Sequence, residues 1–377
     1  MVVIRIDPGN AKGATVSAVF EEVNFIPLET KKESMFGNIA KLRMIGTNFV
    51  IFDWDTKSIL IFSNNGKYIN KIEAGNGDSR PGELYQFEVQ HENGRGLILI
   101  RDNRFVFFYD EKGTLLKKMP SYAYSKYTQL KPHYTLKTSW MDKDSALYEY
   151  AFFKDDSLFS KYFLLRPAKG RSDIFNTGNG VSQQELETNY FLTRTYSYDI
   201  YKITLPNICL VYRLIFPNAN SLPADFASNP AYIGRENRFN YFRTNKAVVL
   251  SLSNIHLFGD NLFVKLGIDR STVGGTNVLV YNLKNREAIS LNHIEPDTMS
   301  WFLPINDAGQ GPDFGFYGFH FYAGGYLYTS NSSLVMFGSK NENAGKNISY
   351  NEALTHYFKT ESARSNPVIV QLKPRNN

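Results

Sequence analysis

The segment from Trp301 to Tyr317 concentrates side chains that could recognise a ligand. It mixes aromatic rings with amides and carboxylates, and its Gly and Pro residues interrupt regular structure. Such a set suits a sugar or a peptide, because rings stack on apolar faces while polar groups form directional hydrogen bonds. We take seven side chains as candidates for ligand binding: Trp301, Asn306, Asp307, Gln310, Asp313, Phe316 and Tyr317. The competing interpretation is an aromatic-rich connection that packs against its own fold.

The residue patterns of common catalytic centres are missing from the sequence. The six histidines are dispersed, with no His-x-His or His-Glu-x-x-His, so a structural zinc site is not expected. There is no Gly-x-Ser-x-Gly turn, the local signature of many serine hydrolases. We therefore assign no catalytic residue and no cofactor-binding residue, and we expect a binding protein rather than an enzyme.

Composition narrows the class of protein further. Of 377 residues, 42 are basic and 36 acidic, and this dispersed excess of +6 is typical of a solvated surface rather than of a nucleic-acid interface. No apolar run reaches the length of a membrane-spanning helix. Cys209 is the single cysteine, which excludes an intramolecular disulfide, and its apolar neighbours predict a thiol buried in a strand. We expect a monomer.

A repeat indicates the fold that must position these residues. The stretch from Ile59 to Ile69 and the stretch from Phe105 to Leu115 each contain an apolar strand, a polar turn with Gly, and a second strand. A recurring hairpin of this kind is typical of the four-stranded blade of a β-propeller. With many short Val, Ile, Tyr and Phe runs between turns, the chain is predicted to be all-β and to form a six-bladed β-propeller.

We expect a single domain over residues 1–377. Residues 1–30 would supply N-terminal strands and ring closure, 39–119 the first two blades, 120–345 the remaining blades with long loops, and 349–377 a short helix and the closing strand. Ser349 and Glu352 form a capping-box pattern that predicts where this helix begins. The apolar runs 247–250 and 334–337 are interpreted as strands, and the Pro- and Asn-rich stretch 216–243 as a surface loop.

Several motifs resemble those of six-bladed propellers abundant in Bacteroides and its relatives, akin to NHL-repeat and TolB-like propellers. Val23–Thr30 resembles the opening phrase of that family, Gly75–Leu84 its Gly-rich loop between blades, and Asn366–Val370 its closing strand. Arg80 and Leu84 depart from the usual loop sequence. The resemblance implies an exported protein of the periplasm or cell surface, often a lipoprotein, whose leader is not among residues 1–377. Most members have no established activity.

The sequence therefore predicts a non-catalytic binding or scaffolding propeller of the cell envelope that recognises a glycan, a peptide or a protein partner. Its ligand would bind where the repeat breaks, at 216–243 or 301–317. The alternative is a calcium-dependent enzyme of the lactonase or lyase type, with the metal in the central channel. Asp102, Asp199 and Asp269 could converge there, whereas Asp53 and Asp55 alone supply too few oxygens and suit a hairpin turn.

Overall fold

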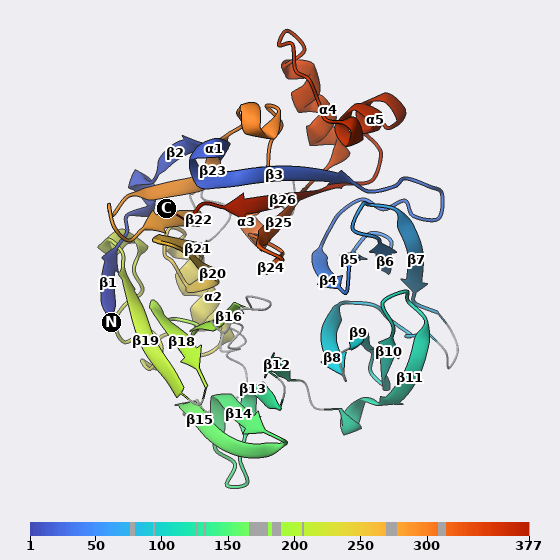
Figure 1. The fold of residues 1–377 in the computed structure, drawn as a ribbon. Coiled ribbons are helices and arrows are strands. Elements are labelled where there is room, and N and C mark those ends of the chain that lie inside the picture. Colours follow the sequence, from blue (N-terminus) through green and yellow to red (C-terminus); the bar gives the residue numbers. More distant parts are fainter. Residues whose placement is uncertain are drawn as a thin grey trace. The chain divides into compact units, whose positions relative to one another are not determined.

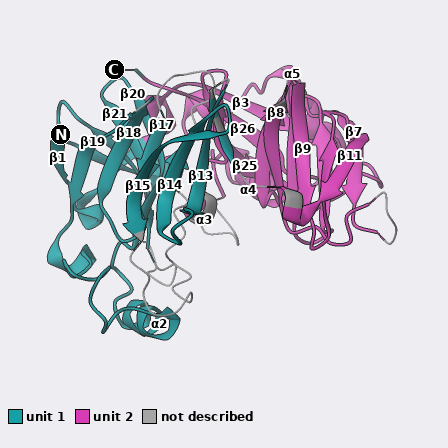
Figure 2. Cartoon of the chain, turned by 90° about the horizontal axis from the view of Figure 1, so that it is seen from below, with its two compact units in different colours: residues 1–14, 126–294, 376–377 teal, residues 15–125, 295–375 magenta. Residues whose placement is uncertain are grey.

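The computed structural model contains six β-sheets of four or five strands each, the blades of a six-bladed β-propeller, as the sequence predicts (Figure 1). It describes residues 1–377 except 76–79, 93–94, 125–126, 132, 166–179, 183–189, 206, 269–276, 308–313 and 377. The chain divides into two compact units with three sheets each, which Figure 2 colours separately. Unit 1 comprises residues 1–14, 126–294 and 376–377, and unit 2 comprises residues 15–125 and 295–375.

Unit 2 holds the two hairpin repeats. One sheet consists of β4 (Lys41–Ile45), β5 (Asn48–Asp53), β6 (Ser58–Phe62) and β7 (Tyr68–Glu73). The next consists of β8 (Phe87–Glu92), β9 (Arg95–Arg101), β10 (Phe105–Tyr109) and β11 (Leu115–Pro120), followed by the short helix η2 (Ser121–Ala123).

The two repeated turns have the same backbone geometry. Gly66 and Gly113 have φ values of 81° and 79°, in the left-handed region that a glycine adopts without steric cost. In both hairpins the ladder shifts register just before the turn, at Phe62 and at Tyr109. A side chain at position 66 would also collide with the backbone of Pro27, since a Cβ there would lie 2.1 Å from the carbonyl oxygen.

The third sheet of unit 2 joins the two ends of the chain. Its strands, in spatial order, are β24 (Phe321–Ala323), β25 (Tyr326–Asn331), β26 (Val368–Pro374) and β3 (Phe20–Pro27). The C-terminal strand β26 is therefore central and the N-terminal strand β3 covers its edge, with Val370 opposite Phe25. Closure of an edge by a terminal strand is the role predicted for these segments.

Unit 1 begins with a four-stranded sheet and a five-stranded sheet. The first holds β12 (Thr128–Lys131), β13 (Tyr134–Met141), β14 (Leu147–Lys154) and β15 (Ser157–Leu165). The second holds β16 (Gly180–Ser182), β17 (Tyr190–Thr193), β18 (Asp199–Thr204), β19 (Asn207–Ile215) and, at its outer edge, β1 (Val2–Arg5).

The last sheet of unit 1 is likewise completed by an N-terminal strand. It consists of β20 (Ser251–Phe258), β21 (Asn261–Gly267), β22 (Val278–Asn282), β23 (Ala288–Glu295) and β2 (Lys12–Thr15). The strand predicted over 247–250 is wrong, because β20 begins at Ser251, and Val248 and Val249 are buried in the connection that precedes it. Short helices η1 (Pro8–Asn10) and α1 (Val16–Val19) separate the three N-terminal strands.

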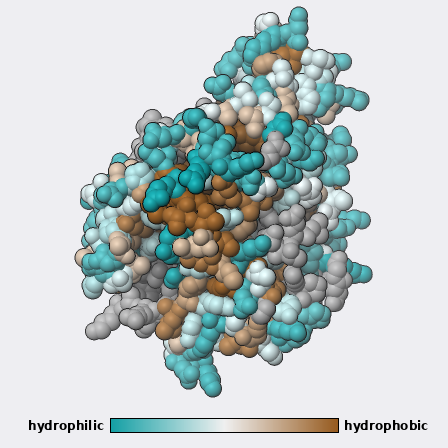
Figure 3. All heavy atoms as spheres, turned by 60° about the vertical axis from the view of Figure 1, so that its left-hand side comes forward, coloured by the Kyte–Doolittle hydropathy of each residue, from teal (hydrophilic) through white to brown (hydrophobic). Residues whose placement is uncertain are grey.

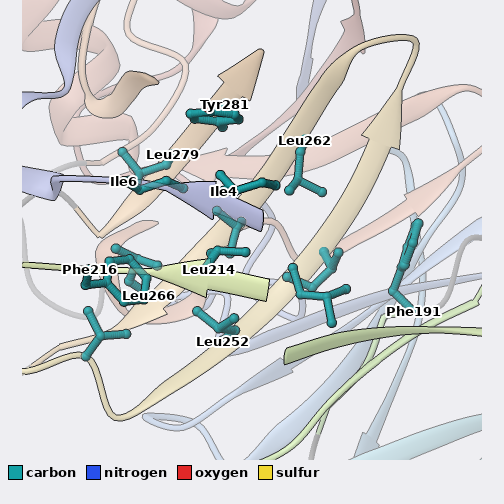
Figure 4. Close-up of a cluster of buried hydrophobic side chains, with 14 residues drawn as sticks. Ile4, Ile6, Phe191, Leu214, Phe216, Leu252, Leu262, Leu266, Leu279 and Tyr281 are labelled. Carbon is teal, nitrogen blue, oxygen red and sulfur yellow. The ribbon is translucent and has the colours of Figure 1, made fainter. Parts of the chain in front are cut away.

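A buried apolar cluster holds the two five-stranded sheets of unit 1 together. Figure 4 shows Ile4 and Ile6 next to side chains of β19, β20, β21 and β22. Ile4 and Ile6 are fully enclosed, and burial of one such side chain contributes roughly 1.5–3 kcal/mol. Two hydrogen bonds also link neighbouring sheets of unit 1. Tyr150 of β14 donates to the carbonyl of Thr193 in β17 at 2.9 Å, and the Thr193 hydroxyl donates to the carbonyl of Leu252 in β20 at 2.7 Å.

The long connections lie at one end of the strands within each unit. Successive antiparallel strands reverse direction, so consecutive connections alternate between the two ends. In unit 2 the tight hairpin turns 63–67, 110–114 and 324–325 lie at one end, and the long connections 28–40, 296–320 and 332–367 lie at the other. The long connection of unit 1, 216–250, takes the equivalent end of its own sheets.

Helices occur mainly in these long connections. They are η3 (Asn218–Asn220), α2 (Arg235–Thr244), η4 (Thr298–Ser300), α3 (Phe314–Tyr317), α4 (Ser333–Glu342) and α5 (Glu352–Thr360). The strand predicted over 334–337 is wrong, since these residues belong to α4. The predicted C-terminal helix is confirmed as α5, although its N-cap is Asn351 rather than Ser349. No helix in the described ranges is long and apolar enough to span a membrane.

Candidate recognition surface

The first part of the candidate segment 301–317 is anchored to unit 2. Asp297 accepts hydrogen bonds from the backbone N–H groups of Ser17 at 2.8 Å and Met299 at 3.0 Å, which fixes η4. Burial tends to raise the pKa of Asp297, but these hydrogen bonds outweigh it and the pKa lies below its usual range. Trp301 then packs edge-on against Phe25 of β3, with ring centroids 6.2 Å apart.

Residues 302–307 continue along α4. The carbonyl of Phe302 accepts hydrogen bonds from Ser339 at 3.1 Å and Asn343 at 3.4 Å, both at the C-terminal end of that helix. Asp307 accepts from the backbone N–H of Ser332 at 2.7 Å, directly before the helix begins, and Asn306 is buried. Trp301 and Asp307 therefore both contact other residues of unit 2.

The structure places only part of the predicted set. Gln310 and Asp313 lie outside the described residues, and Phe316 and Tyr317 fall in α3 with side chains that are not described. Trp301, Asn306 and Asp307 lie on one connection, which runs from η4 towards α4. Whether the seven residues together bind a ligand stays a prediction.

A second surface lies in unit 1, where the expected surface loop 216–243 contains a helix. This expectation is wrong for its second half, because α2 begins at Arg235. Figure 2 shows α2 beyond the ends of the unit 1 strands. The helix has an unusual distribution of side chains: Arg238 is 1% exposed and the adjacent Phe239 is 60% exposed. Large apolar side chains are ordinarily the buried ones.

Arg238 anchors α2 through its guanidinium group. The group lies 4.3 Å from the ring centroids of both Tyr196 and Phe226, and it donates a hydrogen bond to the carbonyl of Phe226. Tyr232 and Tyr241 complete the aromatic cluster, each with its ring centroid 4.9 Å from that of Phe226. A cation between two ring faces is attracted by both, most strongly where water is excluded.

Replacing Arg238 with alanine is expected to release α2 from the connections that carry Tyr196 and Phe226. The change removes a buried hydrogen bond from a charged donor and two cation–π contacts, together about 3 kcal/mol. Amide hydrogen exchange in residues 235–244 should accelerate by about two orders of magnitude relative to the wild type. Arg235→Ala on the exposed side of the same helix is the matched control, and equal exchange in both variants would contradict the anchoring role.

The exposed side of α2 combines an aromatic ring with cations. Arg235, Phe239 and Arg243 are spaced four residues apart, so they lie along one side of the helix. All three are exposed, and within the described part of the chain neither guanidinium has an ion pair. Sequence analysis missed this set because the spacing has meaning only once a helix is assigned.

The acidic residues considered for calcium have local partners. Asp102 accepts from the backbone N–H groups of Gly82, Arg104 and Phe105 at 2.7–3.0 Å, and Asp199 forms a two-pronged ion pair with Arg213. Asp269 lies outside the described residues.

The predicted turn at Asp53 is present. Asp53 is buried and accepts hydrogen bonds from Asn38 and Thr56, which shape the turn between β5 and β6. Within the described ranges, no three His, Cys, Asp or Glu side chains lie close enough together to hold a metal ion.

Comparison with known proteins decides the family. The model of a domain of unknown function, DUF4934, matches residues 1–373. The chain belongs to the DUF4934 family. Among curated proteins, none matches this DUF4934 chain.

Comparison with solved structures identifies a protein of the same fold. A Bacteroides fragilis protein whose name describes it as exported has 14% sequence identity and a TM-score of 0.65, over 99% of this chain and 100% of its own. A Bacteroides vulgatus member of the DUF4221 family has 12% identity and a TM-score of 0.45, over 95% of this chain and 98% of its own. At these identities the first likeness shows the propeller fold alone.

Proposed function

We propose that this DUF4934 protein is a non-catalytic binding or scaffolding module of the bacterial cell envelope, which recognises a glycan, a peptide or a protein partner. The likeness to an exported Bacteroides protein supports the location, and the opening and closing motifs support kinship with NHL-type propellers and lipoproteins. The proposal assigns the protein no metal and no cofactor. Propellers suit recognition because rigid sheets present long connections on one surface.

The observation that carries the proposal is the exposed side of α2. Arg238 already anchors the helix, and Phe239 projects away from the sheets with most of its surface in water. An exposed ring offers a stacking surface for a sugar or an aromatic side chain. The flanking Arg235 and Arg243 can pair with the carboxylates of an acidic sugar or an acidic peptide. We name Arg235, Phe239 and Arg243 the α2 surface.

Binding is tested with Phe239→Ala. The wild-type protein is applied to an array of bacterial and host glycans and to a library of acidic peptides. We expect the bound probes to lose about tenfold or more in affinity with the variant, since truncation of a central aromatic residue costs about 2 kcal/mol in many interfaces. Affinity is measured by titration calorimetry with the probe that gives the strongest array signal.

Leu334→Ala on α4 is the matched control, because Leu334 is equally exposed but lies in unit 2. It should bind as the wild type does. Full binding by Phe239→Ala would remove the α2 surface from the proposal, and a loss shared by both variants would show that the effect is not specific to this helix.

A further inference from the structure

The turn between β5 and β6 presents a tryptophan to water. Trp54 is 49% exposed, although tryptophan side chains are on average mostly buried. Its ring packs edge-on against the buried Phe52, with ring centroids 4.8 Å apart and 72° between the ring planes. Contact with Phe52 therefore fixes the orientation of the indole, and about half of its surface stays open to a ligand.

The backbone of this turn is held in one conformation. The buried Asp53 accepts hydrogen bonds from the backbone N–H groups of Asn38 at 3.1 Å and Thr56 at 2.8 Å, and from the Thr56 hydroxyl at 2.7 Å. Lys57 ends the turn in the left-handed region, with φ at 46°. Because the turn is already fixed, a ligand that binds to it has little conformational entropy to remove.

A carboxylate and an amide belong to the same surface. Asp55 is exposed, and among the described residues its carboxylate has no hydrogen bond or ion pair. It lies over Gly37 of the connection 28–40, where a Cβ would come within 2.9 Å of its Oδ2 atom. Asn38 follows on that connection, and its side-chain amide is a further donor and acceptor. An aromatic ring, a carboxylate and an amide together provide the stacking and the hydrogen bonds that a sugar requires.

The apolar surface near β1 is of a different kind. Figure 3 shows apolar side chains gathered on the side of the molecule that carries β1, and Val2 and Val3 of that strand are exposed. Aliphatic side chains have no π face, whereas the face of an indole attracts the weakly positive C–H groups of a sugar ring. Of the three tryptophans, Trp140 and Trp301 are half-buried and only Trp54 is exposed.

We propose that Trp54, Asp55 and Asn38, which we call the Trp54 site, bind one ring of a neutral oligosaccharide. The indole stacks on the apolar face of a pyranose, and the Asp55 carboxylate accepts hydrogen bonds from its hydroxyl groups. A neutral sugar fits better than an acidic one, because Asp55 places a negative charge on the same turn as the ring. The ligand class rests on the proposed function, whereas the Trp54 site belongs to unit 2 and the α2 surface to unit 1.

Fluorine NMR of the full chain labelled with 5-fluorotryptophan tests where a sugar binds. The chain has three tryptophans, so three resonances are expected, and the one that is missing in Trp54→Phe belongs to Trp54. Maltotetraose, cellotetraose and mannotetraose are titrated as neutral probes. We expect at least one of them to shift the Trp54 resonance in a saturable manner, while the resonances of Trp140 and Trp301 stay in place.

Asp55→Ala tests the hydrogen bonds without a change to the ring. Asp55 is exposed and has no partner among the described residues, so thermal melting of the variant should match that of the wild type. Its affinity for the sugar that shifts Trp54 should fall about tenfold, because hydrogen bonds to a charged acceptor are strong. Glu342→Ala, which removes an exposed carboxylate from α4 of the same unit, is the matched control and should bind as the wild type does.

Phe239→Ala distinguishes the Trp54 site from the α2 surface. It should bind the neutral sugar as the wild type does, and Asp55→Ala should keep the affinity of the α2 surface for its own probe. The Trp54 site is overturned if none of the three sugars shifts the Trp54 resonance, or if Asp55→Ala and Glu342→Ala bind equally well. Neither result would affect the α2 surface, which has its own titration. A sugar whose affinity falls in Phe239→Ala instead would bind at α2 and would also overturn the Trp54 site.

Discussion

Asn366→Ala is expected to lower the free energy of unfolding of unit 2 by about 3–5 kcal/mol, because it removes the hydrogen bonds that hold the C-terminal part of the chain to the N-terminal part. The Asn366 side chain is fully buried. It accepts from the backbone N–H of Phe36 at 3.0 Å and donates to the carbonyls of Glu29 at 2.8 Å and Ser34 at 2.9 Å. Alanine leaves three buried backbone groups without this partner, each costing about 1–3 kcal/mol.

Urea unfolding followed by tryptophan fluorescence measures the loss, since two of the three tryptophans, Trp54 and Trp301, belong to unit 2, while Trp140 reports on unit 1. Asn366→Asp should lie between the wild type and the alanine variant, because it keeps the acceptor and loses both donors. Asn347→Ala, at an exposed position, is the matched control and should change stability by less than about 0.5 kcal/mol. If Asn366→Ala and this control have the same free energy of unfolding, the hydrogen bonds of Asn366 do not stabilise unit 2 as predicted.

The contact between the two ends of the chain, through β3, β26 and Asn366, explains why the opening and closing motifs could be predicted from the sequence. The opening motif Val23–Thr30 and the closing motif Asn366–Val370 lie at opposite ends of the sequence, yet β3 and β26 pair residue by residue and Asn366 binds the chain just beyond β3. Similarly, Gly66 and Gly113 recur because both turns need a left-handed residue. Where local backbone geometry requires one residue type, a single sequence reveals it.

Prediction failed where apolar runs have no distinct period. The run 334–337 suits a strand as well as one turn of helix, and only the Ser332 N-cap, which accepts from the N–H of Val335, distinguishes them. α2 was missed for the opposite reason: it buries Arg238 and exposes Phe239, so it lacks the apolar stripe that predicts a helix. Its anchor combines Phe226, on the segment just before the helix, with Tyr196, which lies much further back in the sequence.

The candidate site was only partly predictable for a related reason. The side-chain types in 301–317 indicate a recognition segment. In the structure Trp301 contacts β3 and Asp307 contacts the start of α4, and these contacts cannot be predicted from the local sequence. Cys209 shows the same limit. Its apolar neighbours predict a buried thiol, and this prediction is wrong, because Cys209 is exposed in β19.

Lowering the pH from 7 to 5 is expected to remove about 4 kcal/mol of stability through two histidines, the buried His256 and the partly buried His320. Burial lowers the pKa of His256 to about 3, and burial together with the nearby charge of Arg43 lowers the pKa of His320 to about 3. Unfolding returns each imidazole to its ordinary pKa of 6.5. Between pH 6.5 and pH 3 the unfolded chain therefore binds protons at these two side chains, whereas the folded chain does not. Stability is therefore full above pH 6.5 and falls as the pH drops towards 3.

Each histidine contributes about 2 kcal/mol to the fall between pH 7 and pH 5, at about 1.36 kcal/mol for each unit below 6.5. Urea unfolding at the two pH values measures it. His256→Gln and His320→Gln should each reduce the difference between the two pH values by that amount, whatever they do to stability at pH 7, because glutamine does not titrate. His256 lies in unit 1 and His320 in unit 2, so where the two units unfold separately, each change should affect its own transition.

His293→Gln and His356→Gln are the matched controls, since both side chains are exposed at the surface. They should leave the pH dependence as it is in the wild type. Carboxylates also lose favourable interactions on acidification, but they do so in every variant and cancel from the comparison. A pH dependence that survives in the double variant His256→Gln/His320→Gln would therefore assign the acid sensitivity to carboxylates such as Asp102 and Asp297, whose pKa values are lowered, rather than to the two imidazoles.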